Sequence, residues 1–329
     1  MQRETQVLRE LFDSPKRRLV DQELERVVRA SASSDLLIDD VLYHLRLDTG
    51  RPEPTLGYSK RLRAYLCLLL AEEQGHDLEL ALPSAVTVEL IHNATLIVDD
   101  VQDGDTQRCG RLALWQKTSV AEAMNAAFFL VCTAQAYYHG KAAELHLLDL
   151  GDEIVSAFNS LISGQQRDIS FDRMHERSVA AYERMVDGKT GALLYLSCLM
   201  GCCPRKATEI PHRELWRAFA INLSRLHQLQ DDLDDLVPLT LGATETIVIP
   251  RGNIAAYCLG LASSSRELPR ADLPLVIHDI LSYSQRIAEH LRDSTSILYE
   301  HGLVRADRLL ELVAVLSNRN NQRMGLITA

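Results

Sequence analysis

Apolar residues recur along this chain with the spacing of helices. One segment has apolar residues at i, i+1, i+5, i+6 and i+9, which predicts an amphipathic helix: Leu36, Leu37, Val41, Leu42 and Leu45. The strongly apolar stretch 60–73 predicts a buried helix, and Pro83 predicts the first turn of a helix that runs to Asp103. Strand alternation with turn dipeptides does not recur, so the pattern predicts an all-α protein.

The same periodicity predicts further helices in addition to the one at 36–45. They cover 7–12, 120–139, 142–148, 153–168, 179–203, 214–235, 253–263, 273–299 and 306–320. Loops are predicted at 48–58, which holds two Gly and two Pro, and at the polar stretch 104–113. The chain has only 16 Gly and 10 Pro among 329 residues, which indicates long helices. No repeat period stands out, and we predict a single domain over residues 1–329.

Composition narrows the class of protein. A hydrophobic share of 47% with 24% charged residues is typical of a soluble globular chain. The 45 acids against 35 Lys and Arg argue against a nucleic-acid partner, since phosphate backbones attract basic surfaces. The seven cysteines form no CxxC pair, which argues against zinc and favours a reducing compartment. With neither an apolar leader nor a run near 20 apolar residues, we expect a cytoplasmic protein without a membrane span.

Two acidic clusters stand at the ends of predicted apolar helices. The first is Asp99-Asp100-Val101-Gln102-Asp103 and the second is Asp231-Asp232-Leu233-Asp234-Asp235. In each, the first and last aspartates are four residues apart and project from one helix face. Like charges at this spacing repel, and the helix dipole disfavours anions at a C-terminus. Both clusters are therefore placed against local stability.

A bound cation would resolve this unfavourable placement. Oxygen ligands select hard cations, and Mg²⁺ is commonly held by a few carboxylates together with substrate phosphates. One cluster alone is most simply interpreted as a solvated acidic helix end. Two clusters of equal spacing, about 130 residues apart, favour the binding of Mg²⁺ and a diphosphate.

With these motifs the chain resembles the trans-isoprenyl diphosphate synthases of the polyprenyl synthetase family, from about Gly57 to Asp235. The resemblance implies a single helical bundle around a central apolar cavity, prenyl diphosphate substrates, and a homodimer. It implies Mg²⁺, as three ions, bound by the acids of both clusters: Asp99, Asp100, Asp103, Asp231, Asp232 and Asp235.

Short basic and polar elements resemble other parts of the family pattern. Lys60 and Arg63 resemble its GKxxR element, which holds isopentenyl diphosphate, with His92 near the same diphosphate and Ser59 in place of Gly. Arg108 and Lys189 would bind the allylic diphosphate, and Gln165 would line the cavity. Catalytic roles are implied for Asp99, Asp103, Asp231, Lys189, Thr190 and Gln228.

The sequence departs from the family pattern at three places. Cys109 replaces the second of two arginines, and a neutral thiol cannot make the bidentate contact of a guanidinium. The loop 237–250 contains no Lys or Arg, so Arg251 is the first basic residue after the second cluster. A Gly-Asp pair is not evident around residues 125–127.

Three functions are compatible with this set of motifs, two of them enzymatic and one not. The leading hypothesis is a head-to-tail prenyltransferase, in which isopentenyl diphosphate attacks an allylic cation and the released diphosphate takes up a proton. A terpene synthase that ionises and cyclises one prenyl diphosphate is favoured by Cys109 but opposed by Lys60, Arg63 and His92. A non-catalytic subunit of a larger synthase is opposed by the intact acid clusters. The small residues Ala94 and Thr95 favour geranylgeranyl or longer products, unless Phe128 and Phe129 form the floor.

Overall fold

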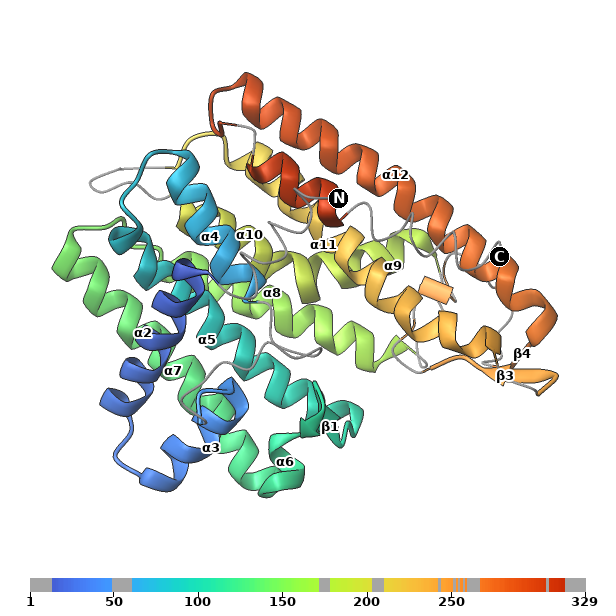
Figure 1. The fold of residues 1–329 in the computed structure, drawn as a ribbon, viewed down its shortest axis with the longest axis horizontal. Coiled ribbons are helices and arrows are strands. Elements are labelled where there is room, and N and C mark those ends of the chain that lie inside the picture. Colours follow the sequence, from blue (N-terminus) through green and yellow to red (C-terminus); the bar gives the residue numbers. More distant parts are fainter. Residues whose placement is uncertain are drawn as a thin grey trace. The chain divides into compact units, whose positions relative to one another are not determined.

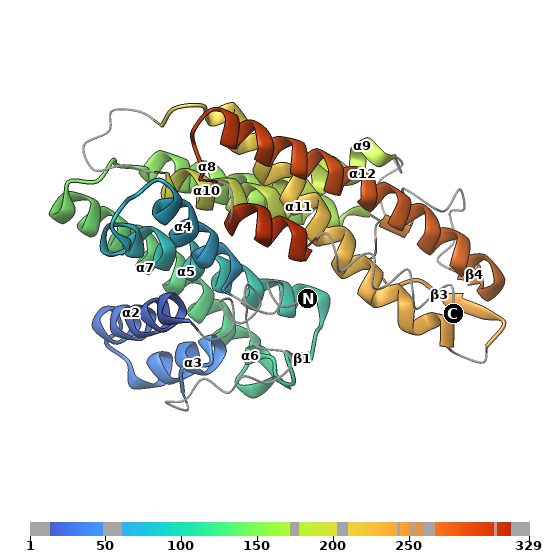
Figure 2. The same ribbon diagram turned by 45° about the horizontal axis from the view of Figure 1, so that its top comes forward.

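The computed structural model describes most of the chain. The described residues are 14–48, 61–171, 178–202, 210–241, 244–250, 253, 255–256, 258, 267–305 and 308–316. They divide into two compact units, residues 1–155 with 196–211, and residues 156–195 with 212–329. Nearly all regular structure in both is helical (Figures 1 and 2), so the all-α prediction is confirmed. A single domain over the whole chain stays a prediction.

The first unit is centred on two long helices, α5 and α7, which pack along each other. Helix α4 packs on α5, and α2 and α3 contact the same group (Figure 1). The bounds are α2 (Pro15–Ser31), α3 (Asp35–Leu45), α4 (Leu62–Glu73), α5 (Leu78–Asp103), α6 (Leu114–Lys117) and α7 (Val120–Leu145). The predicted buried helix is α4, in which Leu66, Leu69 and Leu70 are fully buried. Burial of such side chains contributes about 1.5–3 kcal/mol each.

Side-chain caps explain where several helices begin. Ser119 accepts a hydrogen bond from the amide of Glu122 and donates to its carboxylate, which starts α7. Asp77 accepts from the amide of Glu79 and starts α5. The predicted start at Pro83 is therefore wrong, and Pro83 lies inside α5. The predicted helices 120–139 and 142–148 are one continuous helix, α7.

A short hairpin follows α5. Strands β1 (Gln107–Arg108) and β2 (Arg111–Leu112) pair antiparallel around Cys109 and Gly110, whose φ angles are 50° and 78°. Two-residue hairpin loops require such positive φ angles, which a cysteine adopts less readily than glycine or asparagine. The Gly104 residue before the hairpin, with φ 73°, ends α5.

The second unit is organised around α11 and α12, which also pack along each other (Figure 2). Its described helices include α8 (Gly151–Ile169), α9 (Val179–Val186), η2 (Asp187–Gly191), α10 (Ala192–Gly201), α11 (Arg213–Leu236), η3 (Val237–Leu241), η5 (Arg270–Asp272) and α12 (Leu273–Glu300), and residues 308–316 are also helical. Helices α8 and α10 each have one end in the first unit. Strands β3 (Thr246–Val248) and β4 (Glu267–Pro269) pair antiparallel. Trp216 and Phe219, which belong to α11, are fully buried.

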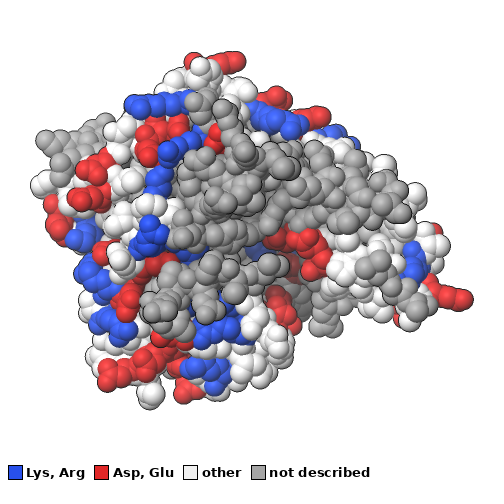
Figure 3. Space-filling model, viewed as in Figure 1, with Lys and Arg blue, Asp and Glu red and all other residues white. Residues whose placement is uncertain are grey.

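The surface carries charges of both signs, and the described cysteines form no disulfide. Acidic and basic side chains are intermingled on the face shown in Figure 3. All six described cysteines are free thiols. The predicted helix 7–12 and most of the predicted helix 253–263 lie outside the described residues.

Candidate functional site

The first acidic cluster occupies the last turn of α5. Asp99 is half-buried and Asp103 is exposed, one helical turn apart on the same face. Asp100, the next residue along the helix, faces the protein interior and is buried. The left-handed Gly104 ends the helix, with its amide bonded to the Asp100 carbonyl. The predicted face of Asp99 and Asp103 therefore forms, with Asp100 behind it.

Asp100 is paired with Arg108 of the hairpin. The Nε of Arg108 lies 2.7 Å from one carboxylate oxygen of Asp100 and 2.9 Å from the other, and an Nη lies 2.6 Å away. Burial raises the pKa of Asp100, although Arg108 opposes the rise. Two residues predicted to bind metal and diphosphate thus hold each other in this structure.

The hairpin also contacts the end of α3. Arg46 donates hydrogen bonds to the carbonyls of Arg108, at 2.8 Å, and Cys109, at 2.5 Å. Arg111 makes two bonds to Asp48, at 2.6 and 3.0 Å, so its guanidinium is directed toward α3. The exposed Cys109 supplies no cation at its own position.

A histidine lies beneath this group of arginines. The Nε2 atom of His44, on α3, is buried and has no hydrogen-bond partner among the described residues. Burial, together with the charges of Arg108, Arg61 and Arg46, lowers the pKa of His44 to about 3, against a backbone hydrogen bond at Asn93 that raises it. His44 is therefore neutral at physiological pH.

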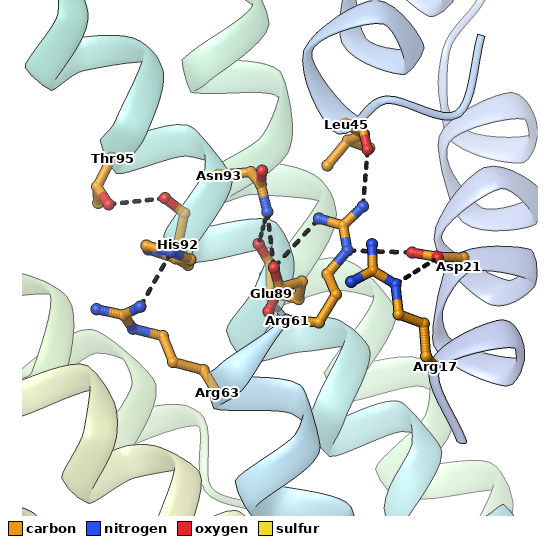
Figure 4. A network of polar contacts seen from close by, with 9 residues as sticks. All are labelled: Arg17, Asp21, Leu45, Arg61, Arg63, Glu89, His92, Asn93 and Thr95. Atoms are coloured by element: carbon orange, nitrogen blue, oxygen red, sulfur yellow. Dashed lines mark hydrogen bonds and ion pairs between the residues drawn. The ribbon is translucent and has the colours of Figure 1, made fainter. Parts of the chain in front are cut away.

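The basic residues at the start of α4 meet α5. Arg63 lies with an Nη 3.0 Å from Nε2 of His92 (Figure 4). Because a guanidinium only donates, Nε2 of His92 accepts, which places the neutral ring's proton on Nδ1. The structure thus brings together two of the three residues predicted to bind isopentenyl diphosphate. The third, Lys60, lies outside the described residues, as does Arg251.

The second acidic cluster occupies the end of α11, in the second unit. Asp231 and Asp235 are exposed and share one face, while Asp232 is buried. His227 lies with Nδ1 3.0 Å from a carboxylate oxygen of Asp231. Both clusters therefore have the same arrangement, with an outer pair of aspartates and one inner aspartate.

The inner aspartate, Asp232, accepts two hydrogen bonds. Tyr182 donates to one oxygen at 3.1 Å and Gln228 to the other at 3.0 Å. Burial, together with the charges of Asp231 and Asp235, raises the pKa of Asp232 to about 7, although these two bonds oppose the rise. Burial raises the pKa of Tyr182 well above 10, so Tyr182 stays a donor.

The predicted Lys189-Thr190 element lies in a π-helical turn, η2, between α9 and α10. Lys189 forms an ion pair with Asp168. Thr190 donates to Oε1 of Gln228 at 3.2 Å, which leaves the amide of Gln228 to donate to Asp232. Gln228 thus links the π-helical turn to the second acidic cluster, and π-helical turns recur at functional sites.

Two contacts behind this turn were not predicted from the sequence, one of them at Gly164, which resembles part of the family pattern together with Gln165. Gly164 of α8 packs so closely on η2 that a Cβ there would lie 2.6 Å from the Gly188 carbonyl carbon. Arg225 of α11 makes two 2.8 Å bonds to Asp187, the first residue of η2, and a third of 2.8 Å to Glu183. A basic residue six positions before the second cluster was the available signal. Gln165, next to Gly164, is buried.

The donor set at both clusters suits a hard cation. Within the described ranges, no three His, Cys, Asp or Glu side chains are grouped as a preformed metal site. Each unit instead offers a pair of carboxylates one helical turn apart. Mg²⁺ typically takes one or two protein carboxylates and completes its shell with water and phosphate oxygens, so these residues fit Mg²⁺ bound together with a diphosphate.

One described helix, α5, is long and apolar enough to cross a membrane by length and composition alone. Its most apolar window is 72% buried within the protein, as in the core helix of a globular fold.

Comparison with known proteins gives one consistent result. The sequence model of the family described as Polyprenyl synthetase matches residues 55–242. A short chain isoprenyl diphosphate synthase of Methanocaldococcus jannaschii is 31% identical over 235 residues, which are 69% of this chain and 65% of the relative. A geranylgeranyl diphosphate synthase of Mycobacterium tuberculosis is 33% identical over 192 residues, 58% of this chain and 55% of the relative. The chain thus matches less than two thirds of the length of either relative.

A solved structure extends the likeness. The crystal structure of a polyprenyl synthetase from Streptomyces coelicolor matches with a TM-score of 0.69 and 24% identity, covering 95% of this chain and 98% of its own. At this identity the match shows a shared fold.

Proposed function

The chain belongs to the polyprenyl synthetase family, and on that premise we propose that it is a Mg²⁺-dependent head-to-tail prenyltransferase. It condenses an allylic diphosphate with isopentenyl diphosphate to a longer prenyl diphosphate. The observation that carries the proposal is the matched pair of acidic helix ends, Asp99 with Asp103 and Asp231 with Asp235. A basic pair, Arg63 and His92, supports binding of a second anionic substrate.

Each group has a role that follows from its chemistry. Asp99, Asp103, Asp231 and Asp235 hold Mg²⁺, with Asp100 and Asp232 in support; bound Mg²⁺ supplies charge neutralisation for the leaving diphosphate. Lys189 and Arg108 bind the allylic diphosphate as cations, and Lys60, Arg63 and His92 bind isopentenyl diphosphate.

The chain's residues then assist the condensation. The allylic carbon–oxygen bond breaks, and the double bond of isopentenyl diphosphate attacks the resulting allylic carbon. The released diphosphate takes up the proton that the new product loses. The oxygens of Thr190 and Gln228 stabilise the allylic cation, and Gln165 with the apolar helix walls excludes water from it.

Product length is assigned from residues close to the first acidic cluster. Ala94 is buried, and Thr95 is half-buried with its hydroxyl bonded to the His92 carbonyl. Both side chains are small, which leaves room for a growing chain, and Phe128 is exposed. We therefore assign geranylgeranyl or longer products. Separately, the family resemblance supports a homodimer as the acting form, which we place in the cytoplasm.

A terpene synthase is the second candidate, and Cys109 favours it. A cyclase ionises one prenyl diphosphate and needs no second-substrate arginine, and the hairpin has an exposed thiol at this position. The Arg63–His92 pair opposes it, because a cyclase has no second diphosphate to bind.

Substitution of the outer aspartates tests the proposed metal site. With Mg²⁺ and both diphosphates, Asp99→Ala and Asp231→Ala should each lower kcat/KM at least about 10²-fold, since a lost charged contact to the reacting complex removes a few kcal/mol. Asp105→Ala, two residues after the first cluster, and Asp234→Ala, within the second, are matched controls, because they remove exposed aspartates that have no assigned role. Equal kcat/KM in all four variants would refute the site.

A further inference from the structure

Arg61 has an unusual backbone and an unusual environment. It precedes the first residue of α4 with φ 47°, in the left-handed region that disfavours residues with a Cβ. Its side chain is only 2% exposed. A strained backbone of this kind persists only where surrounding contacts hold it, and such positions cluster at functional sites.

The guanidinium of Arg61 binds three helices at once (Figure 4). Its Nε donates to Asp21 of α2 at 3.0 Å, one Nη to Glu89 of α5 at 3.1 Å, and the other to the Leu45 carbonyl of α3 at 2.8 Å. Asp21 also accepts from Arg17, at 3.0 Å. Desolvation lowers the pKa of Arg61, but Asp21 and Glu89 outweigh it, so Arg61 stays charged.

The contact with Glu89 lies beside the Arg63–His92 pair. Arg61 and Arg63 both come from the start of α4, and Glu89 and His92 are three residues apart on α5, so they are neighbours on its surface. Two parallel links therefore join α4 to α5. The link through Arg61 is buried and the link through Arg63 is part-buried. Asn93 donates to the carboxylate of Glu89 at 3.1 Å, which fixes the buried link from the other side.

Stability alone is a weak reason for such a buried network. Apolar residues of similar volume often replace buried ion pairs without loss of stability. A planar guanidinium with fixed donor directions instead defines position, which a lysine ammonium does less well.

We propose that Arg61 is a positioning residue for isopentenyl diphosphate: by fixing α4 against Glu89 it sets the geometry of Arg63 and His92. The inference rests on the proposed function, which assigns that substrate to this pair. Arg61 itself is buried and does not touch the substrate.

The test compares the same substitution at two arginines of one network. Arg61→Lys keeps the charge but loses the three-way contact, whereas Arg17→Lys changes an equally buried arginine that also binds Asp21. Glu89→Gln removes the negative charge that holds the same link, with Arg61 retained, and so serves if Arg61→Lys does not fold. We expect Arg61→Lys and Glu89→Gln to raise the KM for isopentenyl diphosphate about tenfold, as for other outer-shell partners. The KM for the allylic diphosphate should not change, and Arg17→Lys should change neither.

Two results would overturn the inference. One is an isopentenyl diphosphate KM in Arg61→Lys or Glu89→Gln close to that of wild type. The other is an equal rise in both KM values in all variants, Arg17→Lys included, which is the mark of general loosening. Wild-type protein that makes no longer diphosphate would refute the proposed function instead. Titration calorimetry with isopentenyl diphosphate then decides, because a weaker Kd confined to Arg61→Lys and Glu89→Gln supports positioning and equal Kd values contradict it.

Discussion

Gly164 is the position at which one added methyl group should disturb the site most. A Cβ built on Gly164 would lie 2.6 Å from the carbonyl carbon of Gly188 and 2.8 Å from Cα of Lys189, and closer still to the Lys189 amide. Ordinary contacts begin near 3.4 Å. The obstacle is backbone, which cannot rotate away as a side chain can. In Gly164→Ala, α8 and η2 must therefore separate at this contact.

The size of the effect follows from the missing space. The contact with the Gly188 carbonyl carbon must widen from 2.6 Å to at least 3.4 Å, and that with the Lys189 amide must widen by more; overpacking of this kind typically destabilises by about 1–3 kcal/mol. Because Gly164 lies within α8, alanine also gains about 0.5–1 kcal/mol of helix propensity, which offsets part of the loss. We expect a net loss of about 1–2 kcal/mol. Lys189 and Thr190 move with η2, so binding of the allylic diphosphate weakens too.

The assay is urea unfolding together with steady-state kinetics. Gly140→Ala is the matched control, because Gly140 lies within α7 and nothing stands within 4 Å of its Cβ position. Gly140→Ala should gain about 0.4–1 kcal/mol and leave both KM values unchanged. Gly164→Ala should lose stability and raise the KM for the allylic diphosphate, with that for isopentenyl diphosphate unchanged. A Gly164→Ala protein as stable as Gly140→Ala would refute the reasoning.

Two further predictions concern stability. The pKa of His44 is about 3 in the folded state, below the ordinary 6.5, so the folded protein holds His44 neutral. The folded state therefore has its full stability with respect to His44 above pH 6.5, and it loses stability as the pH falls below 6.5. Unfolding free energy should therefore drop by about 2 kcal/mol between pH 6.5 and 5 through His44, and His44→Gln should lack this part of the slope in urea titrations; identical slopes would contradict it. The bidentate Arg225–Asp187 pair should give a coupling energy of about 1–2 kcal/mol in a double-mutant cycle of Arg225→Met and Asp187→Asn, and additive losses would show that the pair does not hold η2.

Periodicity predicted most of the long helices, but it missed α2 (Pro15–Ser31) and did not fix every helix end. The apolar run of α4 and the long periodic stretch of α11 predict their own helices, since burial demands the face that the sequence displays. Pro83 misled because proline is common in a first turn, whereas the start is set by Asp77, six residues earlier. Pro83 is tolerated within α5, where packing on α4 and α7 stabilises the helix.

The placement of the outer aspartates was predictable from the sequence, whereas the partners of the inner aspartates were not. Four-residue spacing places Asp99 with Asp103, whatever surrounds the helix. The partner of Asp100 is eight residues away in a hairpin, and Tyr182 lies fifty residues from Asp232. Such partners depend on how separate elements pack, which no local pattern encodes.

The π-helical turn and the buried arginine lay beyond sequence reasoning for a related reason. Asp187 to Gly191 forms a π turn against Gly164 and Arg225, both from other helices. Arg61 stands between Lys60 and Arg63 and looks like one more surface cation. Only the carboxylates of Asp21 and Glu89 around it show that it is buried. The family resemblance, which the comparisons confirm, assigns roles to Lys60 and Arg63 and none to Arg61.

The central claim is that this protein joins two diphosphate substrates. The most direct measurement incubates it with Mg²⁺ and an allylic diphosphate, with and without isotope-labelled isopentenyl diphosphate, and identifies the products by mass. We predict a longer prenyl diphosphate that carries the label and forms only when both substrates are present. A hydrocarbon or alcohol released from the allylic substrate alone, or no turnover with either mixture, would contradict it.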